Sequence, residues 1–248
     1  MDDFWGWFRW LYDETGINFS VFYDPFHRAA FASAFLMTVR LVVSNLILST
    51  LIGLIGALIL HSRFRLLRWI IRGYVQFFRN TPKLVQLYCF FFGIGALVPR
   101  VDDGTGLIAP IISTVALVVI SFSLYYGAFN VEVFRSGIEA VPDTTVEAAA
   151  ALGMSKLQVY RLVVLPLAFR ICLPAFHNSC VFVVKGTSLA YTVGVAEMLY
   201  VASQIYSLDG NVPEMMNLLL ICYVSLVSLF VYFMGKLERA LKMPGYGT

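Results

Sequence analysis

The sequence contains little charge for its length. Only 13% of its 248 residues are Asp, Glu, Lys or Arg, whereas 59% are hydrophobic and the mean hydropathy is +0.78. This balance excludes an ordinary soluble domain and is typical of a chain embedded in a lipid bilayer. The formal net charge of +3 is too small to indicate a nucleic-acid partner. We therefore expect an integral membrane protein that binds no nucleic acid.

Residues that commonly carry catalysis or bind metals are also scarce. The three histidines, His27, His61 and His177, show no metal-ligand spacing, and no cluster of nucleophile and base is present. Neither a metal site nor a membrane-embedded enzyme is therefore predicted. The cysteines lie in or beside apolar segments and are interpreted as small buried hydrophobic residues rather than a disulfide framework. They are Cys89, Cys172, Cys180 and Cys222.

The sequence has no phosphate-binding loop. The pattern Gly-x4-Gly-Lys-Ser/Thr is absent, because Gly235-Lys236 is followed by Leu237 and lacks the upstream glycine. We therefore expect that the chain cannot hydrolyse ATP alone, is not an enzyme and holds no cofactor of its own.

Long apolar runs dominate the rest of the chain. A helix needs about 20 such residues to cross a bilayer. Five runs reach that length, at about 31–60, 69–98, 107–134, 171–191 and 214–234. Residues 197–213 are predicted to form a polar loop. Because no repeat or low-complexity linker divides the chain, the expected fold is an all-α integral membrane protein with five transmembrane helices, forming a single domain over residues 1–248.

Residues 1–28 are predicted to form an interfacial segment. No apolar run in them is long enough to cross the bilayer. Three tryptophans near the start have the amphipathic rings that suit a membrane interface. A cleavable signal would need a basic start, which Asp2 and Asp3 contradict.

Two of the expected spans contain internal signals. In the first, Ser49, Gly53 and Ala57 recur every four residues, so one helix face is small enough for another helix to approach and should be buried. In the second, Pro82 removes a helical hydrogen bond and restricts the backbone of Thr81. A break or kink is therefore predicted there.

Basic residues gather in the loops after the first and third expected spans and in the C-terminal tail. By the positive-inside rule, these regions are cytoplasmic and the N-terminus lies outside. The residues concerned are Arg63, Arg65, Arg68, Arg135, Lys156, Arg161, Arg170, Lys236, Arg239 and Lys242.

The polar stretch Val141–Pro174 interrupts two apolar runs and should lie in water or at a partner surface. The sequence predicts a short helix over about 145–152, with acceptors for its free N–H groups at 143–145. Gly153 permits a positive φ that ends this helix. Ser155 can cap a second helix that runs from Lys156 to Leu165, before Pro166.

The same stretch resembles the EAA loop of bacterial binding-protein-dependent ABC importers. Glu147-Ala148-Ala149 is followed after three residues by Gly153, and after nine more by Val163-Val164-Leu165-Pro166, which departs from the family's Ile-x-Leu-Pro only at Val163. Three flanking segments resemble the polar amino-acid permease branch of that family. They are Phe78–Pro82, Val131–Ile138 and Lys185–Leu189.

The resemblance implies a type I importer fold and a transport role. The chain would be the permease subunit of an ATP-driven importer in the bacterial inner membrane, for polar amino acids or similar solutes. A partner ABC ATPase dimer would bind ATP and Mg, a second permease subunit, identical or homologous, would complete the path, and a periplasmic binding protein would deliver substrate. Coupling to the ATPase would involve Glu147, Ala148, Ala149, Gly153, Leu165 and Pro166.

Charged residues inside spans are costly, at about 2.5–3.5 kcal/mol each near the bilayer centre, so each needs a reason. Arg40 is interpreted as reaching toward headgroups. Glu132 and Arg135 are interpreted equally as an interfacial ion pair or as part of a pathway. For Lys185 a polar face toward the pathway is favoured. The predicted pathway residues are Arg79, Glu132, Asn178, Lys185, Thr187 and Ser188.

A channel or ion-coupled secondary transporter is the alternative. Such transporters commonly contain internal repeats with matched broken helices. The sequence shows one interrupted run, in the second expected span, and no second copy. The importer interpretation is therefore preferred.

Overall fold

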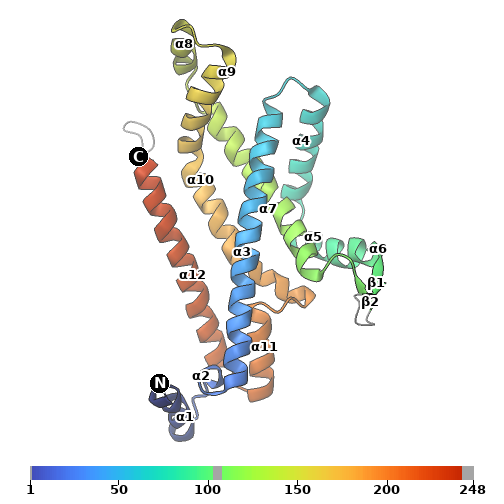
Figure 1. Ribbon diagram of the computed structural model, residues 1–248, viewed down its shortest axis with the longest axis vertical. Helices are drawn as coiled ribbons and strands as arrows, with labels where there is room; N and C mark the ends of the chain where they lie inside the picture. The colour runs from blue at the N-terminus through green and yellow to red at the C-terminus, as the bar shows by residue number, and fades with distance from the viewer. Residues whose placement is uncertain (1, 103–107, 242–248) are drawn as a thin grey trace. The chain divides into compact units, whose positions relative to one another are not determined.

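The computed structural model describes residues 2–102 and 108–241, and these are almost entirely helical (Figure 1). The helices before the first strand are α1 (Asp2–Thr15), α2 (Ser20–Tyr23), α3 (Pro25–Leu60), α4 (Arg65–Asn80), α5 (Lys83–Tyr88), the π-helix η1 (Cys89–Ile94) and α6 (Gly95–Leu97). Two short antiparallel strands follow, β1 (Arg100–Asp102) and β2 (Ile108–Pro110). The remaining helices are α7 (Thr114–Glu139), α8 (Asp143–Ala151), α9 (Lys156–Val159), the π-helix η2 (Tyr160–Val164), α10 (Leu165–Gly186), the 3₁₀-helix η3 (Thr187–Val193), α11 (Met198–Asp209) and α12 (Val212–Leu241).

Four helical segments of the described chain are long and apolar enough to cross a membrane. They are Pro25–Leu60, Thr114–Glu139, Lys156–Val193 and Val212–Leu241. The expected second span is not one helix. Its polar first half is α4, and the shorter apolar stretch Lys83–Leu97 follows. Thr81 is extended at φ −113° and ψ 142° just before Pro82, so the predicted break is confirmed.

The chain folds into two compact units, and most of the long helices contribute to both. The first unit comprises residues 1–44, 88–119 and 184–228, and the second comprises 45–87, 120–183 and 229–248. A core of the first unit contains Phe31, Met198, Ala202, Ile205 and Met215. A core of the second unit lies under α8 and α9 and contains Ala149, Val159, Val164 and Ala168.

Small residues let α3 approach α7 closely in the second unit. Ser49 and Ala57 are completely buried and Gly53 is buried, as predicted. A Cβ atom added at Gly53 would collide with the side chain of Asn130, and one added at Gly56 would collide with Val131. Such close backbone approach is how helices associate in lipid, where the hydrophobic effect does not drive them together.

A ladder of buried polar groups joins the same helices. Ser179 in α10 donates a hydrogen bond to Asn130 of α7 at 2.6 Å, and Asn130 donates to Ser49 of α3 at 3.4 Å. Further along the same two helices, Ser123 of α7 donates to Asn45 of α3 at 3.1 Å. In a bilayer such bonds satisfy groups that no water can reach.

The N-terminal residues form a helix that packs on the start of the first long helix, within the first unit (Figure 1). Phe8 of α1 stacks on Phe22 of α2 with ring centroids 4.4 Å apart, and the Arg28 guanidinium lies 4.7 Å from the Trp5 ring. Trp7 and Trp10 stay about half exposed, at 50% and 55%. One aromatic face of the segment therefore packs against neighbouring residues of the unit, and a second aromatic face is exposed.

Two sequence predictions about elements were wrong. The helix that begins at Lys156 does not end before Pro166 but continues through it. Pro166 has no N–H to donate, but the π-turn at 160–164 has already changed the hydrogen-bond register there, so the missing donor does not end the helix. Residues 197–213 are mostly the helix α11 rather than a loop, since buried Met198, Ala202 and Ile205 repeat at helical spacing.

Predictions at other positions had mixed outcomes. Cys172 and Cys180 are buried as predicted, but Cys89 is exposed on a π-helix that has no buried residue. An apolar side chain in a bilayer need not be covered by protein. Residue 107, where the third span was expected to begin, and Lys242 lie outside the described residues.

Candidate coupling and translocation sites

The predicted EAA loop forms the helix α8, a glycine corner and a second helix, α9. Figure 1 shows both helices next to the beginning of α10. Helix α8 begins at Asp143, two residues earlier than expected, with Pro142 in the N-cap position and no side-chain cap bond. The acidic Asp143 in the first turn is favourable, because the N-terminal end of a helix carries partial positive charge.

The corner itself depends on two residues. Gly153 has φ +81°, a conformation that side chains disfavour, and its N–H donates to the carbonyl of Ala150 at 3.0 Å. Ser155 then forms a capping box, in which its hydroxyl accepts from the N–H of Gln158 and its own N–H donates to the Gln158 side chain at 2.8 Å. Both predictions, the positive φ and the cap, are confirmed.

The corner buries one face and exposes the other. Ala149 is buried in the second unit's core, whereas Glu147 and Ala148 are exposed. Leu152 and Leu157, on either side of Gly153, are 83% and 75% exposed. Leu165 is half-buried and Pro166 is exposed, but both belong to the start of α10 rather than to the corner. An exposed acid followed in the chain by two exposed leucines is suited to a protein partner with a partly apolar groove.

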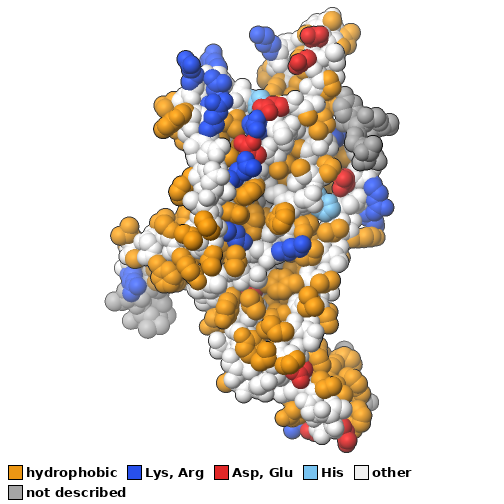
Figure 2. All heavy atoms as spheres, turned by 180° about the vertical axis from the view of Figure 1, so that it is seen from behind, with side chains coloured by type: hydrophobic (Ala, Val, Ile, Leu, Met, Phe, Trp, Pro, Cys, Tyr) orange, Lys and Arg blue, Asp and Glu red, His pale blue; other side chains and the backbone are white. Residues whose placement is uncertain are grey.

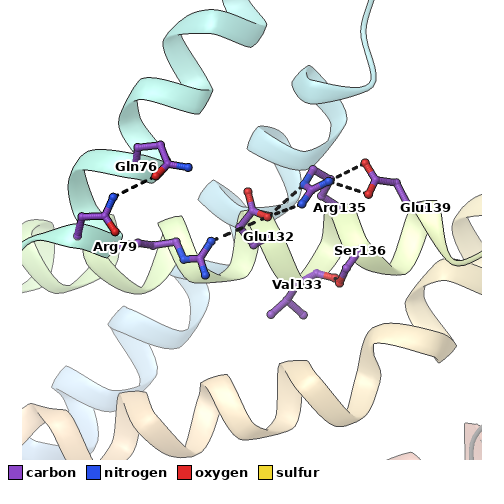
Figure 3. A network of polar contacts seen from close by, with 8 residues as sticks. Gln76, Arg79, Glu132, Val133, Arg135, Ser136 and Glu139 are labelled. Atoms are coloured by element: carbon purple, nitrogen blue, oxygen red, sulfur yellow. Dashed lines mark hydrogen bonds and ion pairs between the residues drawn. The ribbon is translucent and has the colours of Figure 1, made fainter.

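A chain of opposite charges connects α4 with α7 (Figure 3). Arg135 binds Glu132 at 2.7 Å and Glu139 at 2.6 Å on its own helix. The Arg79 guanidinium, from α4, lies 4.0 Å from the same Glu132 oxygen and 5.4 Å from the Phe129 ring centroid. The predicted ion pair of Glu132 and Arg135 is therefore present, and Arg79 is brought to it. Such a network can hold α4 against α7.

The remaining predicted pathway residues lie along α10 and the start of η3. Asn178 and Lys185 are exposed. Ser188 is half-buried and donates to the carbonyl of Lys185 at 3.1 Å. Thr187 is completely buried and donates to the carbonyl of Val184 at 2.9 Å, so its hydroxyl does not share the exposed face. Arg40 is exposed on α3.

Sequence reasoning missed the role of Lys83. Its ammonium donates a hydrogen bond to the Tyr126 hydroxyl at 2.7 Å and lies 4.3 Å from the Phe122 ring centroid and 4.8 Å from that of Tyr126. The Tyr126 hydroxyl in turn donates to the carbonyl of Phe182 in α10 at 2.9 Å. Cation–π contact and hydrogen bonding together compensate for removing this charge from water. In the sequence, the only indication of this role is that the lysine directly follows Pro82, where the helix breaks.

A second missed residue is Glu197, a completely buried carboxylate in the first unit. It caps α11 by accepting from the N–H of Tyr200 at 2.9 Å, and it accepts from the Tyr223 hydroxyl of α12 at 2.8 Å. The neighbouring Met198 N–H donates to Thr38 of α3 at 3.1 Å. Burial raises the pKa of Glu197, while the hydrogen bonds from Leu199, Tyr223 and Tyr200 oppose that shift. This carboxylate joins α11 and α12, and the adjacent Met198 N–H joins α11 to α3.

No group of three or more His, Cys, Asp or Glu side chains that could hold a metal ion occurs among the described residues. The candidate sites described above consist of an exposed helix–glycine–helix corner, ion pairs and polar groups on helix faces.

Comparisons with known proteins agree with this geometry. The family described as "Binding-protein-dependent transport system inner membrane component" matches residues 49–243. The histidine/lysine/arginine/ornithine transport system permease protein HisM of Salmonella typhimurium is 33% identical over 204 residues, covering 82% of this chain and 86% of HisM. The L-cystine transport system permease protein TcyB of Bacillus subtilis is 36% identical over 168 residues, covering 68% of this chain and 67% of TcyB.

Solved structures give the same result. The crystal structure of an amino acid ABC transporter with histidines matches with a TM-score of 0.75 and 25% identity, covering 86% of this chain and 94% of that one. The MetNI methionine ABC transporter, at a TM-score of 0.66 and 19% identity, shares the fold. The chain therefore belongs to the family of inner-membrane components of binding-protein-dependent transport systems, as a non-catalytic permease subunit.

Proposed function

We propose that the chain is the membrane permease of an ATP-driven importer for polar amino acids or amino-acid-like solutes. The observation that carries the proposal is the α8–Gly153–α9 corner, an exposed docking element in a chain whose sequence has no phosphate-binding loop. The substrate class is supported by relatives named for histidine, lysine, arginine, ornithine and L-cystine transport. Family membership leaves no support for an ion-coupled secondary transporter.

In this proposal the corner docks on a separate ATPase. Glu147, Ala148 and Ala149 form the helix that enters a groove on that subunit, and Leu152 and Leu157 supply apolar contact. Gly153 fixes the angle between α8 and α9, so that movement of α8 is transmitted through α9 and η2 to α10. Leu165 and Pro166 act at the start of α10, where the movement enters the membrane. ATP and Mg are bound by the ATPase dimer.

The membrane topology is part of the same proposal. The second of five crossings comprises α4 together with the shorter apolar stretch Lys83–Leu97, with the break at Pro82 between them. The N-terminus is periplasmic with α1 in the interface, and the corner and the C-terminus are cytoplasmic. Reporter fusions within 102–106 and after Lys242 test this arrangement. A cytoplasmic signal at 102–106 would contradict it.

The pathway is proposed to use polar groups of the crossing helices. Arg79 and Glu132 form an ion pair that can open and close as α4 and α7 move. Asn178, Lys185 and Ser188 supply polar contacts along the exposed face of α10 and η3, and Thr187 supports that turn from its buried side. A second permease subunit, identical or homologous, completes the path, and a periplasmic binding protein delivers the solute.

The experiment that tests the proposal is purification of the tagged chain from its native membrane. An ATPase subunit with ATP-hydrolysing activity should be recovered with it. The variant Leu152→Asp/Leu157→Asp should recover much less ATPase, while Leu208→Asp, which changes a comparably exposed leucine near the end of α11, outside the long apolar helices, should not. Equal recovery with both variants would contradict the docking proposal.

A further inference from the structure

A concentrated basic patch lies around the beginning of α4 and is not used by the proposed function. Four arginines fall within ten residues, at Arg63, Arg65, Arg68 and Arg72. Three of them recur at spacings of three and four along α4, so they share one helix face. Figure 2 shows Lys and Arg side chains gathered over this helix.

Within the described ranges 2–102 and 108–241, no carboxylate forms an ion pair with this basic patch. The sequence contains no Asp or Glu between Asp24 and Asp102. Among the residues that the structure describes, the ion pairs use Arg79 and Arg135 but none of these four arginines. The Nε of Arg68 is buried and has no hydrogen-bond acceptor in the described structure. A cluster of guanidinium groups without carboxylate partners repels itself, and an anion would relieve that repulsion.

Apolar side chains flank the basic patch on the same helix. Leu66, Trp69 and Ile70 are 70%, 74% and 49% exposed. The preceding helix α3, long and apolar enough to cross the membrane, ends at Leu60, only three residues before Arg63. The patch therefore begins where a crossing helix ends, with positive charge and exposed apolar surface side by side.

We propose that the basic patch binds an anionic phospholipid, with its phosphate held by the arginines and its acyl chain lying against Leu66, Trp69 and Ile70. Guanidinium groups match phosphate oxygens in forked pairs, which ammonium groups cannot do. Basic clusters beside a membrane helix gain about fivefold in affinity for an anionic surface per residue. A lipid satisfies both halves of the site, whereas free phosphate satisfies only the arginines. This inference is independent of the solute that the importer carries.

The test uses the full-length chain, purified in a neutral detergent and stripped of lipid. Native mass spectrometry measures retained phosphatidylglycerol against phosphatidylcholine at equal concentrations. The wild type should prefer phosphatidylglycerol by about tenfold or more, and added salt should reduce the preference. The variant Arg65→Gln/Arg68→Gln/Arg72→Gln should lose it, and the corresponding triple Lys variant should keep part of it.

The matched control is Lys156→Gln/Arg161→Gln/Arg170→Gln, which removes the same charge from the coupling loop. An equal loss in this control would mean that net charge alone attracts the lipid, and would overturn the proposal. So would an unchanged preference in the Arg65/Arg68/Arg72 variant, or full displacement of the lipid by millimolar inorganic phosphate. Loss of ATPase recovery with unchanged lipid binding would assign the patch to the protein partner instead.

A second measurement needs no change to the arginines. Brominated phosphatidylglycerol should quench tryptophan fluorescence in the wild type more than brominated phosphatidylcholine does. That difference should disappear in Trp69→Phe, which leaves the three N-terminal tryptophans in place. A difference that persists in Trp69→Phe would place the lipid elsewhere and contradict the proposal.

Discussion

Ser179 of α10 donates a 2.6 Å hydrogen bond to the Asn130 side chain of α7, and Gly53 of α3 lies against that same asparagine. Three helices of the second unit thus meet at one buried amide. The close approach of α3 at this point requires that residue 53 has no side chain. This meeting point gives the first prediction.

Gly53→Ala should destabilise the protein by about 1–3 kcal/mol, because the new methyl group would overlap Asn130 and force the helices apart. Gly73→Ala in α4 is the matched control, since nothing lies within 4 Å of a Cβ atom there. It should be neutral or stabilise by up to about 1 kcal/mol. Reversible unfolding in mixed detergent micelles measures both. Similar unfolding free energies for the two variants would contradict the packing account.

Gly153→Val should impair coupling without preventing membrane insertion. The added side chain meets no neighbouring atom, so its cost is the backbone conformation at φ +81°, about 1–2 kcal/mol. The corner angle should change, and ATPase recovery and stimulation should fall. Gly210→Val carries the same kind of strain at φ +71°, at the end of α11, and should leave ATPase stimulation near wild type. Normal stimulated ATPase activity in Gly153→Val would count against the corner's role.

Glu197 should make stability depend on pH. Its pKa is raised by burial above the ordinary value of 4.5, so between these two values the folded state binds more protons than the unfolded state. The unfolding free energy should therefore fall as pH rises from the ordinary pKa through the raised one. In Glu197→Gln this fall should be absent, so the unfolding free energy of the variant should not decrease as the pH rises to neutral. The two proteins are compared by unfolding in micelles across that pH range, and parallel pH profiles would refute this assignment.

Lys185→Met should insert and assemble normally, because it replaces a costly charge with an apolar side chain, yet it should lose most solute uptake. Lys185→Arg should keep part of the uptake. The control is Lys236→Met near the end of α12, whose ammonium lies over the Tyr232 ring and which should transport normally. Unaltered uptake in an assembled Lys185→Met complex would remove Lys185 from the pathway and leave headgroup contact as its role.

Features set by neighbouring residues in the chain could be predicted from the sequence. The Pro82 break, the Gly153 corner, the Ser155 cap and the small face of α3 all follow from local chemistry or helical periodicity, and the structure contains each of them. The stretch with the family's EAA spacing forms a helix, a glycine corner and a second helix, while its coupling to an ATPase stays a prediction.

Features that depend on partners distant in sequence could not be predicted. The sequence predicted that Glu197 begins a polar loop. It could not show that Glu197 accepts a hydrogen bond from Tyr223, because that bond requires α12 to pack beside α11. The environment of Lys83 depends on Phe122 and Tyr126, about forty residues away in the chain. The helix through Pro166 was missed because a π-turn has no sequence signature as clear as that of proline.

The central claim is that this chain forms an ATP-driven import path for polar amino acids with a separate ATPase. It is tested most directly by reconstituting the purified complex in liposomes with its binding protein and measuring uptake of radiolabelled amino acids. The account predicts uptake that requires ATP on the side of the α8–α9 corner and that falls in Gly153→Val. Uptake driven by an ion gradient without ATP would contradict it.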